Sequence, residues 1–116
     1  MNIEACYNKM GADYAEVKSR LPSDAFIKRF ALKFLDDPTF ALLEKSLAEE
    51  NVDEAFRAAH TLKGITQNLG FSQLSPLAIK ITEILRQGTM DGTDTLFPQL
   101  KEKYDMTVAC IKEVDE

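Results

Sequence analysis

The residue best suited to do chemistry is His60, the chain's single histidine, which stands in the run Ala-Ala-His-Thr-Leu-Lys-Gly at 58–64. An accessible imidazole is largely neutral at pH 7, so its unprotonated nitrogen is a nucleophile that can accept a phosphoryl group. One histidine cannot build a multi-histidine metal site, and no cysteine or acidic cluster stands at ligand spacing with it. A Ser-His-Asp triad stays open, although no serine is flanked by nucleophile-elbow glycines. Because no glycine-rich phosphate loop is present either, the phosphoryl group would come from another protein.

Helical geometry predicts that His60 faces solvent. At about 100° per residue, the apolar residues of the surrounding helix fall roughly 140° to 260° away from His60 on a helical wheel. That apolar arc contains Ala55, Ala58, Ala59, Leu62, Ile65 and Leu69. The histidine lies nearly opposite its centre, so we expect the imidazole to be accessible while the other side of the helix faces the core.

The residues that share the helix face of His60 suggest why it is exposed. Lys63 and Gly64 follow at i+3 and i+4, which are adjacent positions on a helix surface, and Gln67 at i+7 continues the ridge. Lys63 supplies a cation that could neutralise an anion carried on the ring. A glycine inside a helix costs about 1 kcal/mol relative to alanine. We therefore infer that Gly64 leaves room for a group bound to the imidazole or for a partner protein.

Phe56 stands one turn before His60 and lies outside the apolar arc. A large apolar side chain beside an accessible histidine predicts a docking patch. Packing of Phe56 against the neighbouring helix is the alternative interpretation.

The elements that must position these residues are all helices, because almost every long segment has helical period and no stretch alternates with period two. We predict helices over 2–9, 14–21, 24–36, 38–50 and 52–69, a sixth that ends before Gly88, and a last one through the C-terminal region. The N-caps expected for the second to sixth helices, apart from the one that begins at Pro38, are Asp13, Ser23, Asn51 and Ser72. The last helix is expected to be capped by Thr93 or Asp94, with Pro98 in its first turn or marking a slightly later start.

These helices predict an all-α protein with one domain over residues 1–116. Four substantial amphipathic helices with short loops indicate an antiparallel up-down four-helix bundle over 23–116. The short helices of 1–22 are expected to lie across one end of it. Only a few residues follow Leu69 before the next helix, so this connection should form a tight antiparallel hairpin.

The composition excludes several classes of function. The chain has 19 Asp and Glu against 14 Lys and Arg, a net charge of -5, which argues against binding to nucleic acid or to an anionic membrane surface. No apolar run approaches the ~20 residues needed to span a bilayer, and the N-terminus does not resemble a signal peptide. Cys6 and Cys110 are expected to be reduced thiols of a cytoplasmic protein, with a disulfide left open.

The run Ala59-His60-Thr61-Leu62-Lys63-Gly64, followed by Asn-Leu-Gly at 68–70 and a leucine-rich helix, closely resembles histidine-containing phosphotransfer (Hpt) domains. The resemblance covers about residues 23–86. It implies a four-helix bundle that carries a phosphoryl group between the aspartates of response-regulator receiver domains. His60 would be the phospho-acceptor through its Nε2 atom, Lys63 would neutralise the phosphate, and Gly64 would open the site.

The resemblance also implies the partners, which are receiver domains, a hybrid histidine kinase, or both. The receiver would supply Mg²⁺, so this chain needs no cofactor or metal of its own, and we expect it to act as a monomer. The initial Met1 favours a free-standing carrier. A non-catalytic helical interaction module is the alternative function. An enzyme with its own active site is disfavoured, because the sequence offers no second catalytic group beside His60.

One position departs from the family pattern. Thr82 and Arg86 should lie on the neighbouring helix near the height of His60 and Phe56. Many family members carry a longer polar residue, often Gln, about where Thr82 stands, in contact with the imidazole. Thr82, Gln67 or a water could orient the ring instead, and we group Thr82 with Phe56 and Gln67 on the docking surface. Arg86 is expected to add a second cation beside the phosphate, or else to be a solvated surface residue.

Overall fold

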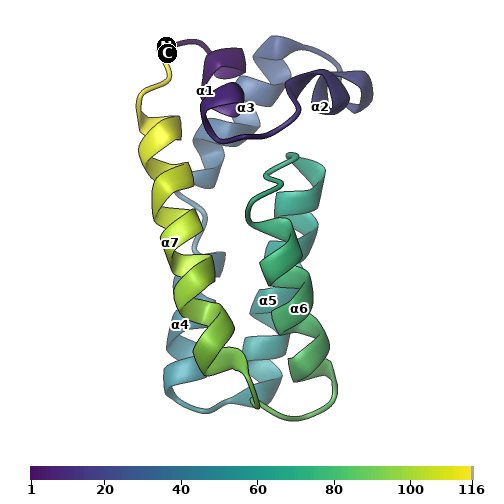
Figure 1. Ribbon diagram of the computed structural model, residues 1–116, viewed down its shortest axis with the longest axis vertical. Helices are drawn as coiled ribbons and strands as arrows, with labels where there is room; N and C mark the ends of the chain where they lie inside the picture. Colours follow the sequence, from purple (N-terminus) through teal and green to yellow (C-terminus); the bar gives the residue numbers. More distant parts are fainter. Residues whose placement is uncertain (116) are drawn as a thin grey trace.

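The computed structural model describes residues 1–115, and these residues form helices without strands (Figure 1). The helices are α1 (Ile3–Lys9), α2 (Tyr14–Arg20), α3 (Asp24–Phe34), α4 (Thr39–Ala48), α5 (Val52–Asn68), α6 (Ser75–Arg86) and α7 (Thr93–Lys112). Helices α3 and α4 lead down the molecule one after the other, and α5, α6 and α7 then run up, down and up (Figure 1). The predicted antiparallel bundle is confirmed. Its first helical position is filled by two successive helices, α3 and α4, and not by one long helix.

Three of the predicted side-chain caps begin the helices α2, α3 and α5. Asp13, Ser23 and Asn51 each accept a hydrogen bond from a backbone N–H three residues on, at 3.2, 3.1 and 3.1 Å. An N-cap of this kind contributes about 1 kcal/mol to helix stability. The break between α3 and α4 also lies at the predicted Asp37-Pro38 pair, where the Asp37 carboxylate accepts from the Thr39 N–H at 2.8 Å.

The start of α6 differs from the prediction that Ser72 is its N-cap. Residues 72–74 form a turn instead, and α6 begins at Ser75 with Leu74 in the capping position. The Phe71 carbonyl accepts from the N–H groups of Leu74 and Ser75, at 2.9 and 3.1 Å. Phe71 and Leu74 are both buried, so hydrophobic burial in the hairpin turn holds the chain in this conformation and leaves Ser72 exposed.

The start of α7 also differs. Neither Thr93 nor Asp94 is the cap, because Gly92 takes that position in a left-handed conformation with φ 93°. Thr93 is buried, and its hydroxyl donates to the Met90 carbonyl at 2.7 Å. The early start places Pro98 in the second turn rather than the first. Pro98 is exposed, so the carbonyl one turn earlier that loses its N–H partner can be hydrated.

The two short N-terminal helices hold the end of α5. The last carbonyls of a helix have no partner within it, and here the side chains of α1 and α2 satisfy them. The Tyr7 hydroxyl donates to the Leu69 carbonyl at 2.6 Å, and the Arg20 guanidinium donates to the carbonyls of Asn68 and Gln67 at 3.3 and 3.4 Å. Burial raises the pKa of the Tyr7 hydroxyl, which therefore remains a donor at neutral pH.

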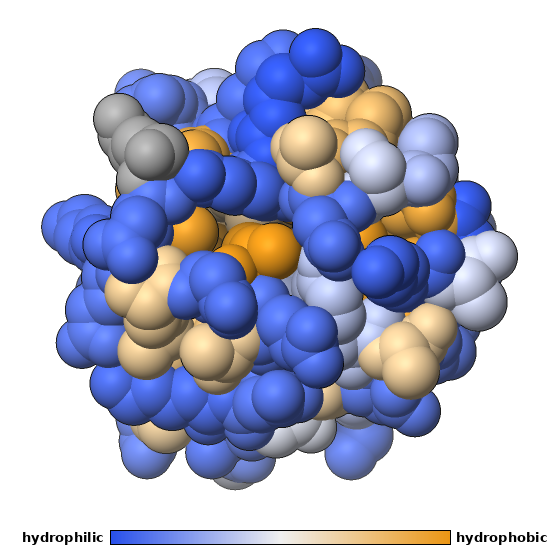
Figure 2. Space-filling view, turned by 90° about the horizontal axis from the view of Figure 1, so that it is seen from above, coloured by the Kyte–Doolittle hydropathy of each residue, from blue (hydrophilic) through white to orange (hydrophobic). Residues whose placement is uncertain are grey.

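Seen from the end that carries α1–α3, the surface is largely hydrophilic, with apolar patches separated by polar residues (Figure 2). The apolar side chains of these helices turn inward and are buried: Ile3, Cys6, Tyr7, Val17 and Ile27. Cys6 and Cys110 are both free and buried. Burial, followed by the neighbouring Cys110, raises the pKa of the Cys6 thiol to about 11, so this thiol stays protonated and unreactive at neutral pH.

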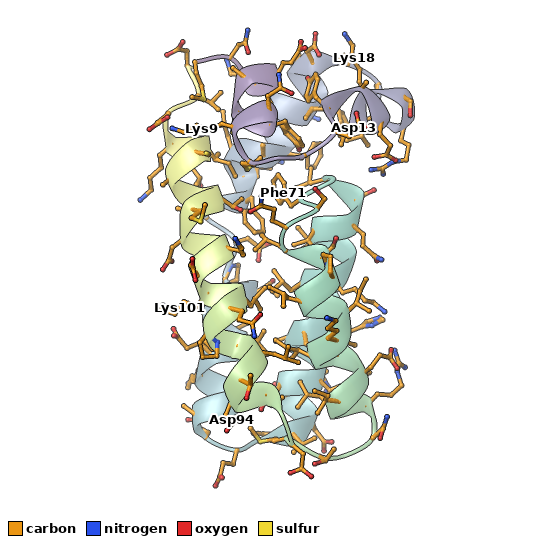
Figure 3. All side chains as sticks on the ribbon, in the orientation of Figure 1. Lys9, Asp13, Lys18, Phe71, Asp94 and Lys101 are labelled. Carbon is orange, nitrogen blue, oxygen red and sulfur yellow. The ribbon has the colours of Figure 1, made fainter. Side chains whose placement is uncertain are left out.

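An aromatic seam joins α3 and α4 to α7. Phe40 stacks on Tyr104 with ring centroids 3.8 Å apart and lies 5.3 Å from Phe97. Phe34 contacts Tyr104 and also Phe71, at 5.7 and 5.1 Å between centroids. Phe71 lies in the interior near the turn between α5 and α6 (Figure 3). The aromatic seam therefore connects α3, α4 and α7 to the hairpin of α5 and α6, which carries His60.

Gly70 is the glycine with the least room for an added side chain. Its φ is 70°, which disfavours other residues, and an added Cβ would collide with the side chain of Val17. We expect Gly70→Ala to lower the free energy of unfolding by about 2–4 kcal/mol, from backbone strain plus steric overlap. Gly88 is the matched control, because its φ is 80° and an added Cβ meets nothing within 4 Å.

Urea denaturation of both variants measures the difference. Gly88→Ala should cost only the backbone strain, about 1–2 kcal/mol. Equal losses in the two variants would contradict the close approach of α2 to the turn between α5 and α6.

Candidate functional site

His60 lies at the middle of α5 with its side chain exposed. The residues on the opposite side of the helix are buried: Ala55, Ala58, Ala59 and Leu62. The predicted exposure is therefore confirmed. Helix α5 packs against α4 on one side and α6 on the other, so its backbone is held by two neighbours while the imidazole remains open to a protein approaching from outside.

Gly64 shares this exposed face. Its backbone is not in the left-handed region, and a Cβ added there would meet nothing within 4 Å. No packing within residues 1–115 therefore requires a glycine at this position. Lys63 is half-buried and lies one turn after His60 on the same helix. Lys63 at i+3 and Gly64 at i+4 flank His60 on its two sides when the helix is viewed along its axis. The site thus combines an accessible nucleophile, a nearby cation and open space.

Phe56, His60 and Arg86 form a contact series across α5 and α6. The Phe56 and His60 rings have centroids 5.9 Å apart and an interplanar angle of 19°. The Arg86 guanidinium carbon lies over the Phe56 ring, 5.2 Å from its centroid. Arg86 also donates from Nε to the Glu83 carboxylate at 3.3 Å. Phe56 is half-buried, and its contact with Arg86 supports the interpretation that it packs against the neighbouring helix.

Thr82 is not part of the exposed surface. Its side chain is fully buried, and its hydroxyl donates to the Ala78 carbonyl at 2.7 Å. The physical reason is that Thr82 lies on the buried stripe of α6, together with Ala78, Ile81 and Leu85. The assignment of Thr82 to a docking surface is therefore wrong, and its hydroxyl is already engaged away from the imidazole. Gln67, by contrast, is exposed on α5.

A shallow depression of about 500 Å³ lies where α5 and α6 meet below His60. Its walls include Val52, Phe56, Arg57, Leu85 and Arg86. Sequence reasoning placed Arg86 near the height of Phe56, but it did not find the direct contact between the two side chains. The i, i+4 spacing of Phe56 and His60 could have indicated ring stacking, whereas the Arg86 contact depends on how the two helices pack.

Among residues 1–115, no group of three or more His, Cys, Asp and Glu side chains is arranged to hold a metal ion. None of the helices in that range is long and apolar enough to span a membrane.

The family model for the Hpt domain matches residues 37–109, which is well over half of the chain. The protein therefore belongs to the Hpt domain family, the phosphotransfer domains of two-component signalling. The matched range contains α4, α5, α6 and most of α7, so it includes every residue of the site described above. Residues 1–36, which form α1–α3, precede it.

A curated relative adds to this assignment. The chain is 39% identical over 69 residues to the chemotaxis protein CheA of Halobacterium salinarum. The matched segment covers 57% of this chain and 10% of the relative. No solved structure gave a significant match.

Gly64 permits a test of the open space beside His60. An exposed glycine inside a helix is less stable than alanine by about 1 kcal/mol, and nothing would collide with the added methyl group. We expect Gly64→Ala to raise the free energy of unfolding by about 1 kcal/mol in urea denaturation. A loss of stability would show that the space is needed by the fold itself and not by a ligand or partner.

Proposed function

We propose that this protein is a histidine phosphotransfer protein of a two-component phosphorelay. In this proposal His60 accepts a phosphoryl group from the aspartyl phosphate of one receiver domain and passes it to the aspartate of another. The observation that supports it best is the exposed face of α5, where His60 stands with Lys63 and Gly64. Membership of the Hpt family supports the same reading.

The proposed transfer needs few groups from this chain. The lone pair on His60 Nε2 attacks phosphorus, the bond between phosphorus and the aspartate oxygen breaks, and the receiver's carboxylate leaves with the bonding electrons. Lys63 neutralises part of the phosphoryl charge, and Gly64 leaves room for the phosphoryl group and the receiver. The receiver's Mg²⁺ would supply further charge neutralisation. The reverse sequence of bond changes delivers the phosphoryl group to the next aspartate.

The partners in this proposal are receiver domains, a hybrid histidine kinase, or both. Gln67 extends the exposed ridge of α5 beyond Gly64 and belongs to the face on which we expect a receiver to dock. The net charge of -5 supports a partner other than nucleic acid or an anionic membrane. We also propose that the protein acts as a monomer in the cytoplasm, where free thiols such as Cys6 and Cys110 are the ordinary state.

His60→Gln is the direct test of the acceptor. Incubation with a phosphorylated receiver should label the wild type with an acid-labile, base-stable phosphate and leave His60→Gln unlabelled. Because His60 is exposed, circular dichroism should show that the variant remains folded. Labelling of the variant at the wild-type rate would refute the assignment. Receiver binding that persists in His60→Ala, with no transfer from any receiver tried, would favour the non-catalytic interaction module.

Lys63→Ala tests the proposed phosphate neutralisation. Removal of one charge-assisted contact from the transferred group should slow labelling by about 10- to 150-fold, since such contacts contribute about 1.5–3 kcal/mol. The stability of the bundle should change little because the ammonium group forms no salt bridge within residues 1–115. A matched control is Lys45→Ala, an exposed lysine on α4, which should transfer at the wild-type rate. Equal rates in all three proteins would remove Lys63 from the site.

A further inference from the structure

We infer that Phe56 is the positioning residue of the phospho-acceptor, and that Arg86 acts through Phe56 to hold the imidazole of His60 in one orientation. This inference rests on the proposed function, because it assigns a role toward the reacting nitrogen. It also changes the expected roles of both residues. Phe56 would not chiefly be a docking residue, and Arg86 would not chiefly be a phosphate ligand.

The first observation is the nearly parallel arrangement of the two rings. Long side chains on a helix lean toward its N-terminus, so the imidazole of His60 leans over the turn that carries Phe56. The 5.9 Å centroid separation and the 19° interplanar angle describe an offset stack. An exposed histidine otherwise samples a broad range of ring torsions. The contact with Phe56 therefore restricts the directions in which Nε2 can point.

The second observation is that Phe56 is itself held from the neighbouring helix. The Arg86 guanidinium lies over the ring, 5.2 Å from its centroid, in a cation–π contact. Glu83, one turn earlier on α6, accepts a hydrogen bond from Arg86 at 3.3 Å and so restricts the guanidinium. The orientation of His60 thus depends on α6 as well as on α5.

The third observation concerns the alternatives for this role. Thr82 is buried and its hydroxyl is engaged by Ala78. Gln67 stands two helical turns beyond His60, toward the C-terminus of α5, whereas the imidazole leans toward the N-terminus. The ring contact that the structure gives to His60 is Phe56, so ring stacking takes the place of the polar contact expected from the family pattern.

The experiment compares Phe56→Leu, which keeps an apolar side chain without the ring, with Phe56→Tyr, which keeps the ring. Arg86→Gln removes the guanidinium. Lys101→Gln is the matched control, because Lys101 also lies over a phenyl ring, that of Phe40, and pairs with a glutamate. Lys101 projects from the outer side of α7, away from α5 and α6 (Figure 3).

Nuclear magnetic resonance reports the orientation directly. His60 is the only histidine, so every imidazole signal belongs to it. In the wild type, the ring current of Phe56 should shift the imidazole protons upfield from the values of a free histidine. Phe56→Leu should abolish this shift, Arg86→Gln should reduce it, and Phe56→Tyr and Lys101→Gln should retain it. Imidazole signals that do not move in Phe56→Leu would overturn the inference.

Labelling rates separate positioning from docking. Phosphoramidate can phosphorylate a histidine without a receiver and can approach an exposed imidazole from any direction, so its rate reports the intrinsic reactivity of the ring and not its orientation. Positioning predicts that Phe56→Leu slows labelling about tenfold with a saturating phosphorylated receiver, because a misoriented nucleophile loses reaction rate toward a docked donor. Labelling by phosphoramidate should be unchanged in the same variant. Slower transfer only at low receiver concentration, with a normal rate at saturation, would identify Phe56 as a docking residue and overturn the inference.

The same measurements distinguish failure of the inference from failure of the proposed function. A wild-type protein that phosphoramidate labels but no receiver does would count against the phosphorelay. The imidazole shifts of the Phe56 and Arg86 variants would still decide whether Phe56 orients the ring.

Discussion

The close packing of α5 between its neighbours is the constraint on which the rest of the structure depends. The buried face of α5 is built largely from small residues, with Ala55 and Ala59 fully buried beside Leu62. Small side chains allow α4 and α6 to approach the helix closely, so its backbone is fixed from both sides. A fixed backbone is what a side chain on the opposite, exposed face requires, since the position of His60 depends on the helix that carries it.

Both ends of α5 are held as well. At the start, Asn51 caps the helix through its side chain. At the end, Tyr7 and Arg20 donate to carbonyls that the helix leaves unpaired. These donors come from α1 and α2, which precede the range matched by the family model. The N-terminal segment is therefore part of this domain, because it stabilises the end of the helix that carries His60.

Local sequence signals predicted much of this arrangement. The period of the apolar residues around His60 identified the exposed face, and capping residues such as Ser23 and Asn51 marked helix starts that the structure confirms. The prediction failed where tertiary packing competes with a local signal. Ser72 is a good cap by residue type, yet the burial of Phe71 delays α6 to Ser75. Thr82 is polar by type, yet its register on α6 places it in the core.

The sequence by itself determined that His60 is exposed on a bundle helix beside Lys63 and Gly64, because helical periodicity relates these residues within one element. Only the tertiary structure decided which side chain meets the imidazole. The contact between Phe56 and Arg86 joins two helices whose relative height and rotation follow from the packing of their buried faces. A side-chain pattern along one helix carries no such information, so the contact that Arg86 makes with Phe56 from a second helix becomes visible only when the helices are assembled.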